Sequence, residues 1–381
     1  MDEQSVFAAT NVFRSIAPER IVSGADSIEQ LPRLLQKMGA DRILIATSNS
    51  VMTKTPNVTR LQGLLGASVV SVFPRCREHS PEQDIFELVD RLRETGATAV
   101  VSIGGSSVFD TVKVALSRLA DAQGAPPHPQ IAIPTTLSAG EFTPGAGYTA
   151  AASGEKALVL DLRVSPRLVI LDPTVTQDTP ESLWFGSAIK AIDHAMEAVW
   201  SRTPHPYVDA LALEAIRLFF TYLPRSRDRD DLEARAACQI AAWMSISGVG
   251  ASGMRLSHFL GHQIGARMHI PHGVTSCILL PAVMRHLRPQ TLAAQVRIAT
   301  AMGVSTGGRD SAEVAAEAAD QLQALIVGLG LPTTISAAGG KIEDIEAVAS
   351  ASMSAAEHLG LTADLPRGIA DVRAILMSTW E

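Results

Sequence analysis

Cysteine, aromatic residues and long apolar runs are all scarce in this sequence of 381 residues. Its three cysteines, Cys76, Cys238 and Cys277, lie far apart and form no CxxC pair, which argues against a disulfide framework and against a thiolate zinc site. No apolar run approaches the length of a membrane span, and the acidic start lacks the basic residues of a signal peptide. We therefore expect a cytoplasmic protein that has no contact with a membrane.

Positive charge is also in short supply. The formal net charge is −7, and no run of lysine or arginine interrupts that average. Aromatic side chains, which stack on nucleic-acid bases in many binding proteins, make up only 4% of the residues. These absences predict that the protein does not bind nucleic acid. A hydrophobic content of 46% with 19% charged residues is typical of a soluble globular protein, and the length suits two domains.

The first half of the chain alternates short apolar runs with segments of helical periodicity, a pattern typical of a parallel sheet covered by helices. Buried strands are expected at Arg42–Thr47, Ser68–Phe73, Ala97–Ile103 and Gln130–Pro134. We expect a short edge strand at Arg20–Gly24, and a hairpin or sheet edge from Ala157–Leu160 and Leu168–Leu171. Beyond Asp172 almost every segment has helical spacing. The sequence thus predicts an α/β domain over residues 1–173 and an all-helical domain over residues 174–381.

A turn rich in glycine and serine follows the strand that ends at Ile103. Its residues Gly104, Gly105, Ser106 and Ser107 stand at the start of a helix, where backbone N–H groups and the helix dipole favour a phosphate. The pattern is not GxGxxG, and glycine pairs are common in ordinary turns, so both interpretations stay open. Small and hydroxylated residues over 135–143 follow the next strand, at the sheet edge where open α/β folds bind ligands.

Four of the ten histidines lie in the stretch Ser257–Pro281. His258 and His262 are four residues apart, so a helix over Met254–Arg267 would place both rings on one face. Pro271 is expected to stop that helix and to bring His272 in from a turn. Convergence of three histidines favours a site over a structural cluster, and imidazole serves both as proton shuttle and as metal ligand.

A second helix, predicted over Pro180–Ser201, carries further candidates. Lys190, His194 and Glu197 share one face by their spacing, whereas Asp193 is assigned to the solvated side. The apolar neighbours of Lys190 and His194 indicate a largely buried helix. A buried lysine is costly unless something pairs with it or uses it.

Taken in order, four motifs resemble those of the iron-containing, group III alcohol dehydrogenases, and in particular the maleylacetate reductase-like branch. They are Gly104-Gly105-Ser106-Ser107-x-x-Asp110-x-x-Lys113, Pro134-Thr135-Thr136 with Glu141-Phe142-Thr143-Pro144, His194-Ala195-Met196-Glu197-Ala198, and Ser257–Pro281. The resemblance implies a Rossmann-like N-terminal α/β domain with a parallel sheet plus an all-α C-terminal domain, the architecture also found in dehydroquinate synthase. It further implies that the cofactor is bound by Ser48, Gly104, Gly105, Ser106, Ser107, Asp110, Thr135, Thr136, Leu137 and Phe142.

The same resemblance places the family's metal ligands at position 190 and at His194, His258 and His272. Position 190 is normally an aspartate, but here it is Lys190, an ammonium without a lone pair. A cation at this point should weaken divalent-metal binding severely, so we expect neither iron nor zinc. Lys190 would then polarise the substrate oxygen, and His194, His258, His262 and His272 would relay protons. The alternative is a metal ion held by His194, His258 and His272 alone.

The expected activity is NAD(P)-dependent interconversion of a small carbonyl compound and its alcohol by hydride transfer. Lys190 and the histidines suit a carboxylated, maleylacetate-like substrate. The residues matching the acid of NAD-selective relatives are Thr47-Ser48-Asn49, so both NAD and NADP are expected to bind. The resemblance also implies a homodimer. The competing interpretations are a metal-dependent alcohol dehydrogenase, a dehydroquinate synthase-type lyase, and a non-catalytic binding protein.

Overall fold

The computed structural model describes residues 18–247 and 255–381. Within them the chain divides into two compact units. One unit comprises residues 18–179 and 226–243, and the other comprises residues 180–225, 244–247 and 255–381. None of the described helices is both long enough and apolar enough to cross a membrane. The predicted helix start at Met254 lies outside the described residues.

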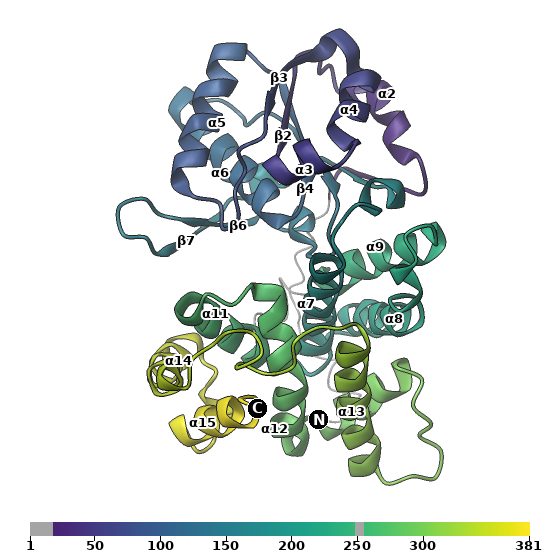
Figure 1. Ribbon diagram of the computed structural model, residues 1–381, viewed down its shortest axis with the longest axis vertical. Helices are drawn as coiled ribbons and strands as arrows, with labels where there is room; N and C mark the ends of the chain where they lie inside the picture. The colour runs from purple at the N-terminus through teal and green to yellow at the C-terminus, as the bar shows by residue number, and fades with distance from the viewer. Residues whose placement is uncertain (1–17, 248–254) are drawn as a thin grey trace. The chain divides into compact units, whose positions relative to one another are not determined.

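The first unit is built on a six-stranded sheet in which all strands are parallel, in the order β1-β8-β5-β4-β2-β3. Figure 1 labels β2, β3 and β4 of this sheet. The strands are β1 (Arg20–Ser23), β2 (Ile43–Thr47), β3 (Val69–Phe73), β4 (Ala99–Gly104), β5 (Gln130–Pro134) and β8 (Leu168–Leu171). Every residue of β2, β4, β5 and β8 is buried. The α/β fold class and the edge strand near residue 20 are therefore confirmed.

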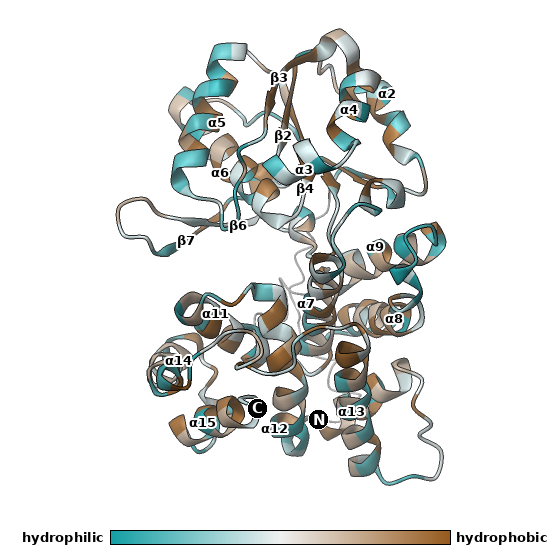
Figure 2. Ribbon diagram, viewed as in Figure 1, coloured by the Kyte–Doolittle hydropathy of each residue, from teal (hydrophilic) through white to brown (hydrophobic). Residues whose placement is uncertain are grey.

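Helices cover both faces of this sheet: α2 (Leu31–Lys37), α3 (Asn49–Lys54), α4 (Asn57–Leu65), α5 (Glu82–Thr95) and α6 (Ser106–Gln123). Because side chains alternate along a strand, Ile43 and Ile45 pack with α2 and α4, whereas Leu44 and Ala46 pack with α5 and α6. The strands are accordingly mostly brown in Figure 2, and α5 mixes apolar and polar residues. Two apolar cores hold the carboxyl ends of β2, β4 and β5 at one edge of the sheet.

The predicted pairing of Ala157–Leu160 with Leu168–Leu171 is wrong. Strand β7 (Lys156–Leu160) instead pairs antiparallel with β6 (Gly145–Thr149), and β8 lies between β1 and β5. The physical reason is burial. All of β8 is apolar and buried, as an inner parallel strand requires, whereas Leu158 and Leu160 of β7 are 74% and 73% exposed.

The second unit consists of helices, and all its described secondary structure is helical. They are α7 (Glu181–Val199), α8 (Pro206–Tyr222), α11 (Leu256–Met268), α12 (His272–Ala301), α13 (Ser311–Gly328), α14 (Ile345–Leu359) and α15 (Ile369–Ser378); α9 (Leu232–Ile246) begins in the first unit. Long α12 packs against α7, α11, α13 and α15. The sequence predicts His272 in a turn, but it is the first residue of α12. Pro271, which has no N–H to leave unpaired, precedes it as the N-cap.

Helices α7 and α12 touch through glycine. A β-carbon placed on Gly273 would lie 2.8 Å from the carbonyl carbon and oxygen of Gly186, closer than atoms can approach. The first turn of α12 therefore lies directly against the backbone of α7. This contact sets the distance between the helix that carries His194 and the helix that begins with His272.

Replacing Gly273 with alanine should destabilise the protein by about 1–3 kcal/mol, because the added methyl group forces packed backbone apart. Urea unfolding followed by circular dichroism measures this free energy. Gly328→Ala is the matched control, since its β-carbon would meet nothing within 4 Å, and its effect should stay within about 0.5 kcal/mol. Equal stability of the two variants would show that the close contact of α7 and α12 is absent.

Candidate active site

The turn from β4 into α6 has the geometry of a phosphate cradle. Gly104 has a φ of 150°, and a β-carbon there would lie 2.7 Å from the Val108 side chain, so only glycine fits. Gly105 is the extended N-cap of α6, and Ser106 and Ser107 form its first turn. The free N–H groups of an 18-residue helix thus begin at the carboxyl edge of the sheet, which is a favourable place for a pyrophosphate.

The loop after β5 lies against this cradle. Thr135 donates its N–H to the carbonyl of Gly104 at 2.9 Å, and the hydroxyls of Ser106 and Ser138 are 2.6 Å apart. Thr136 is buried beside Gly105. The structure therefore brings together the predicted residues of two separate motifs. The glycine turn and the start of α6 are the features of this edge that suit the pyrophosphate of a nicotinamide nucleotide.

The other predicted cofactor residues have different surroundings. Ser48 caps α3 by accepting the N–H of Val51 at 3.3 Å. Asp110 accepts the N–H of Gly147 at 3.3 Å. Leu137 is wholly buried, and the ring of Phe142 stacks on Trp243 with centroids 5.7 Å apart. Leu137 and Phe142 thus contribute to packing of the loop.

Sequence reasoning gave Lys113 no role beyond its place in the motif. Its side chain is fully buried, and Nζ donates to the carbonyls of Gly140 and Gly145 at 2.6 and 3.0 Å and to the Thr143 hydroxyl at 3.3 Å. Burial lowers the pKa of Lys113, and the nearby carboxyls of Asp110 and Glu141 oppose that shift. Burial also raises the pKa of Glu141 to about 7. A lysine among apolar residues of α6 was the available signal.

In the helical unit, α7 is buried over most of its length and carries four ionisable groups toward the neighbouring helices. Lys190 is partly buried, and His194, Glu197 and Asp193 are buried. The assignment of Asp193 to the solvated side is wrong, because its side chain is 0% exposed. Its Oδ2 accepts the hydroxyls of Ser257 and Ser276 at 3.0 and 2.8 Å. Tertiary packing of α11 and α12 covers the face that spacing alone had left to solvent.

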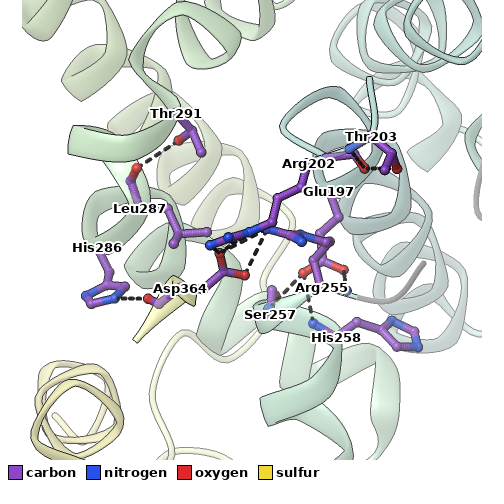
Figure 3. Close-up of polar contacts among 11 residues, drawn as sticks. Glu197, Arg202, Thr203, Arg255, Ser257, His258, His286, Leu287, Thr291 and Asp364 are labelled. Carbon is purple, nitrogen blue, oxygen red and sulfur yellow. Dashed lines mark hydrogen bonds and ion pairs between the residues drawn. The ribbon is translucent and has the colours of Figure 1, made fainter. Parts of the chain in front are cut away.

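Glu197 binds the start of α11 (Figure 3). Its carboxylate accepts the N–H groups of Arg255, Ser257 and His258 at 3.1, 2.8 and 3.3 Å. These are among the N–H groups that a helix leaves without internal partners. Burial, followed by the nearby Asp193, raises the pKa of Glu197 well above its usual value, and the three N–H groups oppose that shift. The guanidinium of Arg255 in turn pairs with buried Asp364 at 2.9 Å. The backbone of His258 is thereby fixed relative to α7.

The four predicted histidines form one cluster. The ring centroid of His258 lies 5.1 Å from that of His194, 4.9 Å from that of His262 and 4.8 Å from that of His272. His262 and His272 are 4.4 Å apart. His194 and His258 are buried, His272 is partly buried, and His262 is exposed. The cluster therefore extends from the interior of the unit to its surface.

Burial and Lys190 keep the inner rings neutral. Burial is the main cause that lowers the pKa of His194 to about 3, and the charge of Lys190 is the next. The pKa values of His258 and His272 are also well below the usual range, again with burial first and Lys190 among the other causes. Within the described residues, Nδ1 of His194, Nδ1 of His258 and Nε2 of His272 have no hydrogen-bond partner. Neutral rings with unused nitrogens can bind a ligand or pass a proton.

The residues present do not fit the iron site of the resembling family. Its carboxylate position is Lys190. The Glu197 carboxylate accepts backbone N–H groups, and Oδ2 of Asp193 accepts two hydroxyls, whereas Oδ1 of Asp193 is buried without a hydrogen-bond partner in the described part of the chain. Nitrogens of His258, His262 and His272 do lie within 4.8 Å of one another, but this set excludes His194 and offers no negative charge. Three imidazoles beside an ammonium, without a carboxylate, make a poor divalent-metal site.

Two sequence profiles match this chain, "Iron-containing alcohol dehydrogenase" over residues 18–173 and "Fe-containing alcohol dehydrogenase family, C-terminal" over residues 186–380. The chain belongs to the iron-containing alcohol dehydrogenase family. A maleylacetate reductase of Burkholderia cepacia is 32% identical over 331 residues, covering 87% of this chain and 88% of that protein. An NAD-dependent methanol dehydrogenase of Bacillus methanolicus is 29% identical over 354 residues, covering 89% and 92%.

Solved structures agree with this membership. The maleylacetate reductase of Agrobacterium tumefaciens superposes with a TM-score of 0.81 at 27% identity, covering 97% of this chain and 99% of that one. The chain is therefore an oxidoreductase of the maleylacetate reductase-like branch, and its family supports a nicotinamide nucleotide as cofactor. The family name includes iron, whereas this chain has Lys190 at the position of a metal ligand. Membership of the family therefore does not decide whether this chain binds a metal.

Replacing Lys113 with methionine should raise the Kd for the nicotinamide nucleotide about tenfold. Three partly buried acceptors would lose their donor, and a loss of about 1.4 kcal/mol in binding corresponds to that factor. Titration of protein fluorescence with NADH and NADPH measures the Kd. Lys37→Met, at an exposed lysine, is the control and should bind as the wild type does. An unchanged Kd in the Lys113 variant would remove this lysine from the support of the loop.

Proposed function

We propose that the protein interconverts a carbonyl compound and its alcohol with NAD or NADP, and that Lys190 takes the role a metal ion has in iron-dependent relatives. The observation that carries this proposal is the charge of Lys190 among the histidines, where it lowers the pKa values of His194, His258 and His272. The two carboxylates of α7 are not among the ligand atoms that lie together in this cluster, which come from His258, His262 and His272.

A bound nicotinamide supplies the hydride in the reducing direction and accepts it in the oxidising direction. As the carbonyl carbon gains hydride, negative charge develops on the oxygen, and the Lys190 ammonium donates a hydrogen bond to that atom. A proton then reaches the oxygen through the histidine cluster, with exposed His262 at its solvent end and His258, His272 and His194 inside. A neutral imidazole can donate from one nitrogen while it accepts at the other.

The substrate is proposed to carry a carboxylate. The Lys190 ammonium has no lone pair to bind a metal ion, so its positive charge can attract a carboxylate. The resembling branch includes maleylacetate reductases. A carboxylated carbonyl compound would gain from this charge in binding as well as in the transition state.

Both NAD and NADP are proposed as cofactors. The turn after β2 presents Ser48 as the N-cap of α3 and has no carboxylate at 47–49, so nothing there repels a 2′-phosphate.

One observation favours a second candidate, a metal-dependent alcohol dehydrogenase. Nitrogens of His258, His262 and His272 lie close enough to share one ion, although the expected set was His194, His258 and His272. Three histidines with an open position can hold a catalytic metal. This candidate requires a neutral Lys190, and it is decided by the metal content of the active enzyme.

The substrate proposal predicts different Michaelis constants for two matched compounds. A 3-oxo acid such as a keto-dicarboxylate should show a KM at least about tenfold lower than its neutral ester, because a charge contact in a partly buried site contributes about 1–2 kcal/mol. Oxidation of NADH or NADPH, followed at saturating cofactor, gives both constants. Equal values would contradict a carboxylated substrate, and no net oxidation with any carbonyl compound would contradict the function itself.

The metal-free mechanism predicts that Lys190→Met lowers kcat about 10²–10³-fold while the Kd for the cofactor is unchanged, since one donor to the developing oxyanion is lost. Lys341→Met, at an exposed lysine of the same unit, should behave as the wild type. Purified wild-type protein should hold less than stoichiometric metal and keep its activity in a chelator.

A gain-of-binding variant sharpens this test. Lys190→Asp recreates the donor set of the family, so calorimetric titration with Zn²⁺ should detect binding in this variant and none in the wild type. An active Lys190→Met protein would remove Lys190 from the mechanism. Stoichiometric metal in the wild type, with activity lost on chelation, would establish the metal-dependent alternative.

A further inference from the structure

A single carboxylate oxygen joins the three helices that carry the buried histidines. Oδ2 of Asp193, on α7, accepts the Ser257 hydroxyl from α11 at 3.0 Å and the Ser276 hydroxyl from α12 at 2.8 Å. All three residues are buried, and each has at most 1% of its surface exposed to solvent.

Each of these residues is close to a histidine along its own helix. Asp193 directly precedes His194, and Ser257 directly precedes His258. Ser276 follows His272 by four residues, one turn further along α12. A shift of one hydroxyl relative to the carboxylate would therefore move an imidazole by a similar amount.

The other contacts at this junction do not duplicate the link. The hydrogen bonds of Glu197 go to the N–H groups at the start of α11. Gly186 and Gly273 limit how closely α7 and α12 approach, but packed glycines do not set rotation of a helix about its axis. Only Asp193, among these contacts, has a directional bond to both helices.

Stability alone gives no reason for an acid here. Burying a carboxylate is costly, and apolar side chains of similar size often stabilise a protein equally well or better. A carboxylate with two hydroxyl donors does, however, define one relative position of three helices, which apolar packing defines less sharply.

We propose that Asp193 is a positioning residue: it holds the rings of His194, His258 and His272 in the arrangement that serves Lys190 during the reaction. Its kinetic consequence rests on the function proposed above, whereas its geometric consequence does not. Displacement of reacting groups by about 1 Å can cost about 10²-fold in rate. The loss should therefore appear in kcat and leave the binding of the cofactor unchanged.

The test compares Asp193→Ala, Asp193→Asn and Ser276→Ala in the full-length protein. Asp193→Ala should lower kcat between about 10-fold and 10²-fold with no change in the Kd for NADH or NADPH. Asp193→Asn should keep at least a third of the wild-type kcat, because the amide oxygen can accept both hydroxyls. Ser276→Ala should lower kcat, and the double variant Asp193→Ala/Ser276→Ala should be no slower than Asp193→Ala alone.

A matched control separates positioning from general loss of a buried acid. Asp209 is buried in the same unit and accepts Arg297 at 2.7 Å. Asp209→Ala should lower Tm as Asp193→Ala does and leave kcat intact. A wild-type kcat in Asp193→Ala would overturn the proposal. So would an equal loss in the asparagine variant, since hydrogen-bond geometry would then not be the cause.

Crystal structures of the wild type and of Asp193→Ala give a readout that needs no turnover. The distances between ring centroids of His194 and His258 and of His258 and His272, now 5.1 and 4.8 Å, should change by at least about 1 Å in the variant. Unchanged distances would overturn the positioning role even if activity fell. A wild-type protein that reduces no carbonyl compound would end the proposed function, and these distances would still decide the role of Asp193.

Discussion

Two buried carboxylates on one helix determine how the helical unit presents its histidines. Glu197 accepts three backbone N–H groups at the start of α11, and Asp193 accepts one hydroxyl from α11 and one from α12. Both acids lie on α7, which also carries Lys190 and His194. Their hydrogen bonds therefore fix the helices of the other histidines, α11 and α12, relative to α7. Removing either acid would leave buried donors without partners, which is a far larger cost than the loss of a surface contact.

The electrostatics of the histidine cluster follow from that arrangement. Helices packed this closely exclude water from His194 and His258, and the charge of Lys190 further disfavours protonation of the rings. The outcome is a set of neutral imidazoles beside one cation. In iron-dependent relatives a carboxylate at position 190 would instead attract a divalent ion. In the function we propose, a single exchange of charge separates two ways of stabilising negative charge on a substrate oxygen within one fold.

Several parts of the molecule could be predicted because their cause is local. The turn at Gly104 must be glycine for steric reasons, strands such as Ile43–Thr47 read as apolar runs, and His258 and His262 share a helix face by spacing alone. The errors have a different cause. Proximity along the chain favours a hairpin or a sheet edge for Leu168–Leu171, whereas its fully apolar character suits the inside of a parallel sheet. Asp193 was assigned to solvent because an acid on a helix usually is, and no local pattern reveals that α11 and α12 cover it.

The sequence by itself determined the class of each half, the glycine turn before α6, the family, and the presence of a lysine where a metal ligand is usual. All of these depend on residue type and on spacing within one element. Only the tertiary structure decided that Asp193 is buried, that Lys113 supports the loop after β5, and that the four histidines form one cluster. Those facts depend on contacts between residues far apart in the chain, whose register is set by packing of whole helices, such as Gly186 against Gly273, and not by any local preference.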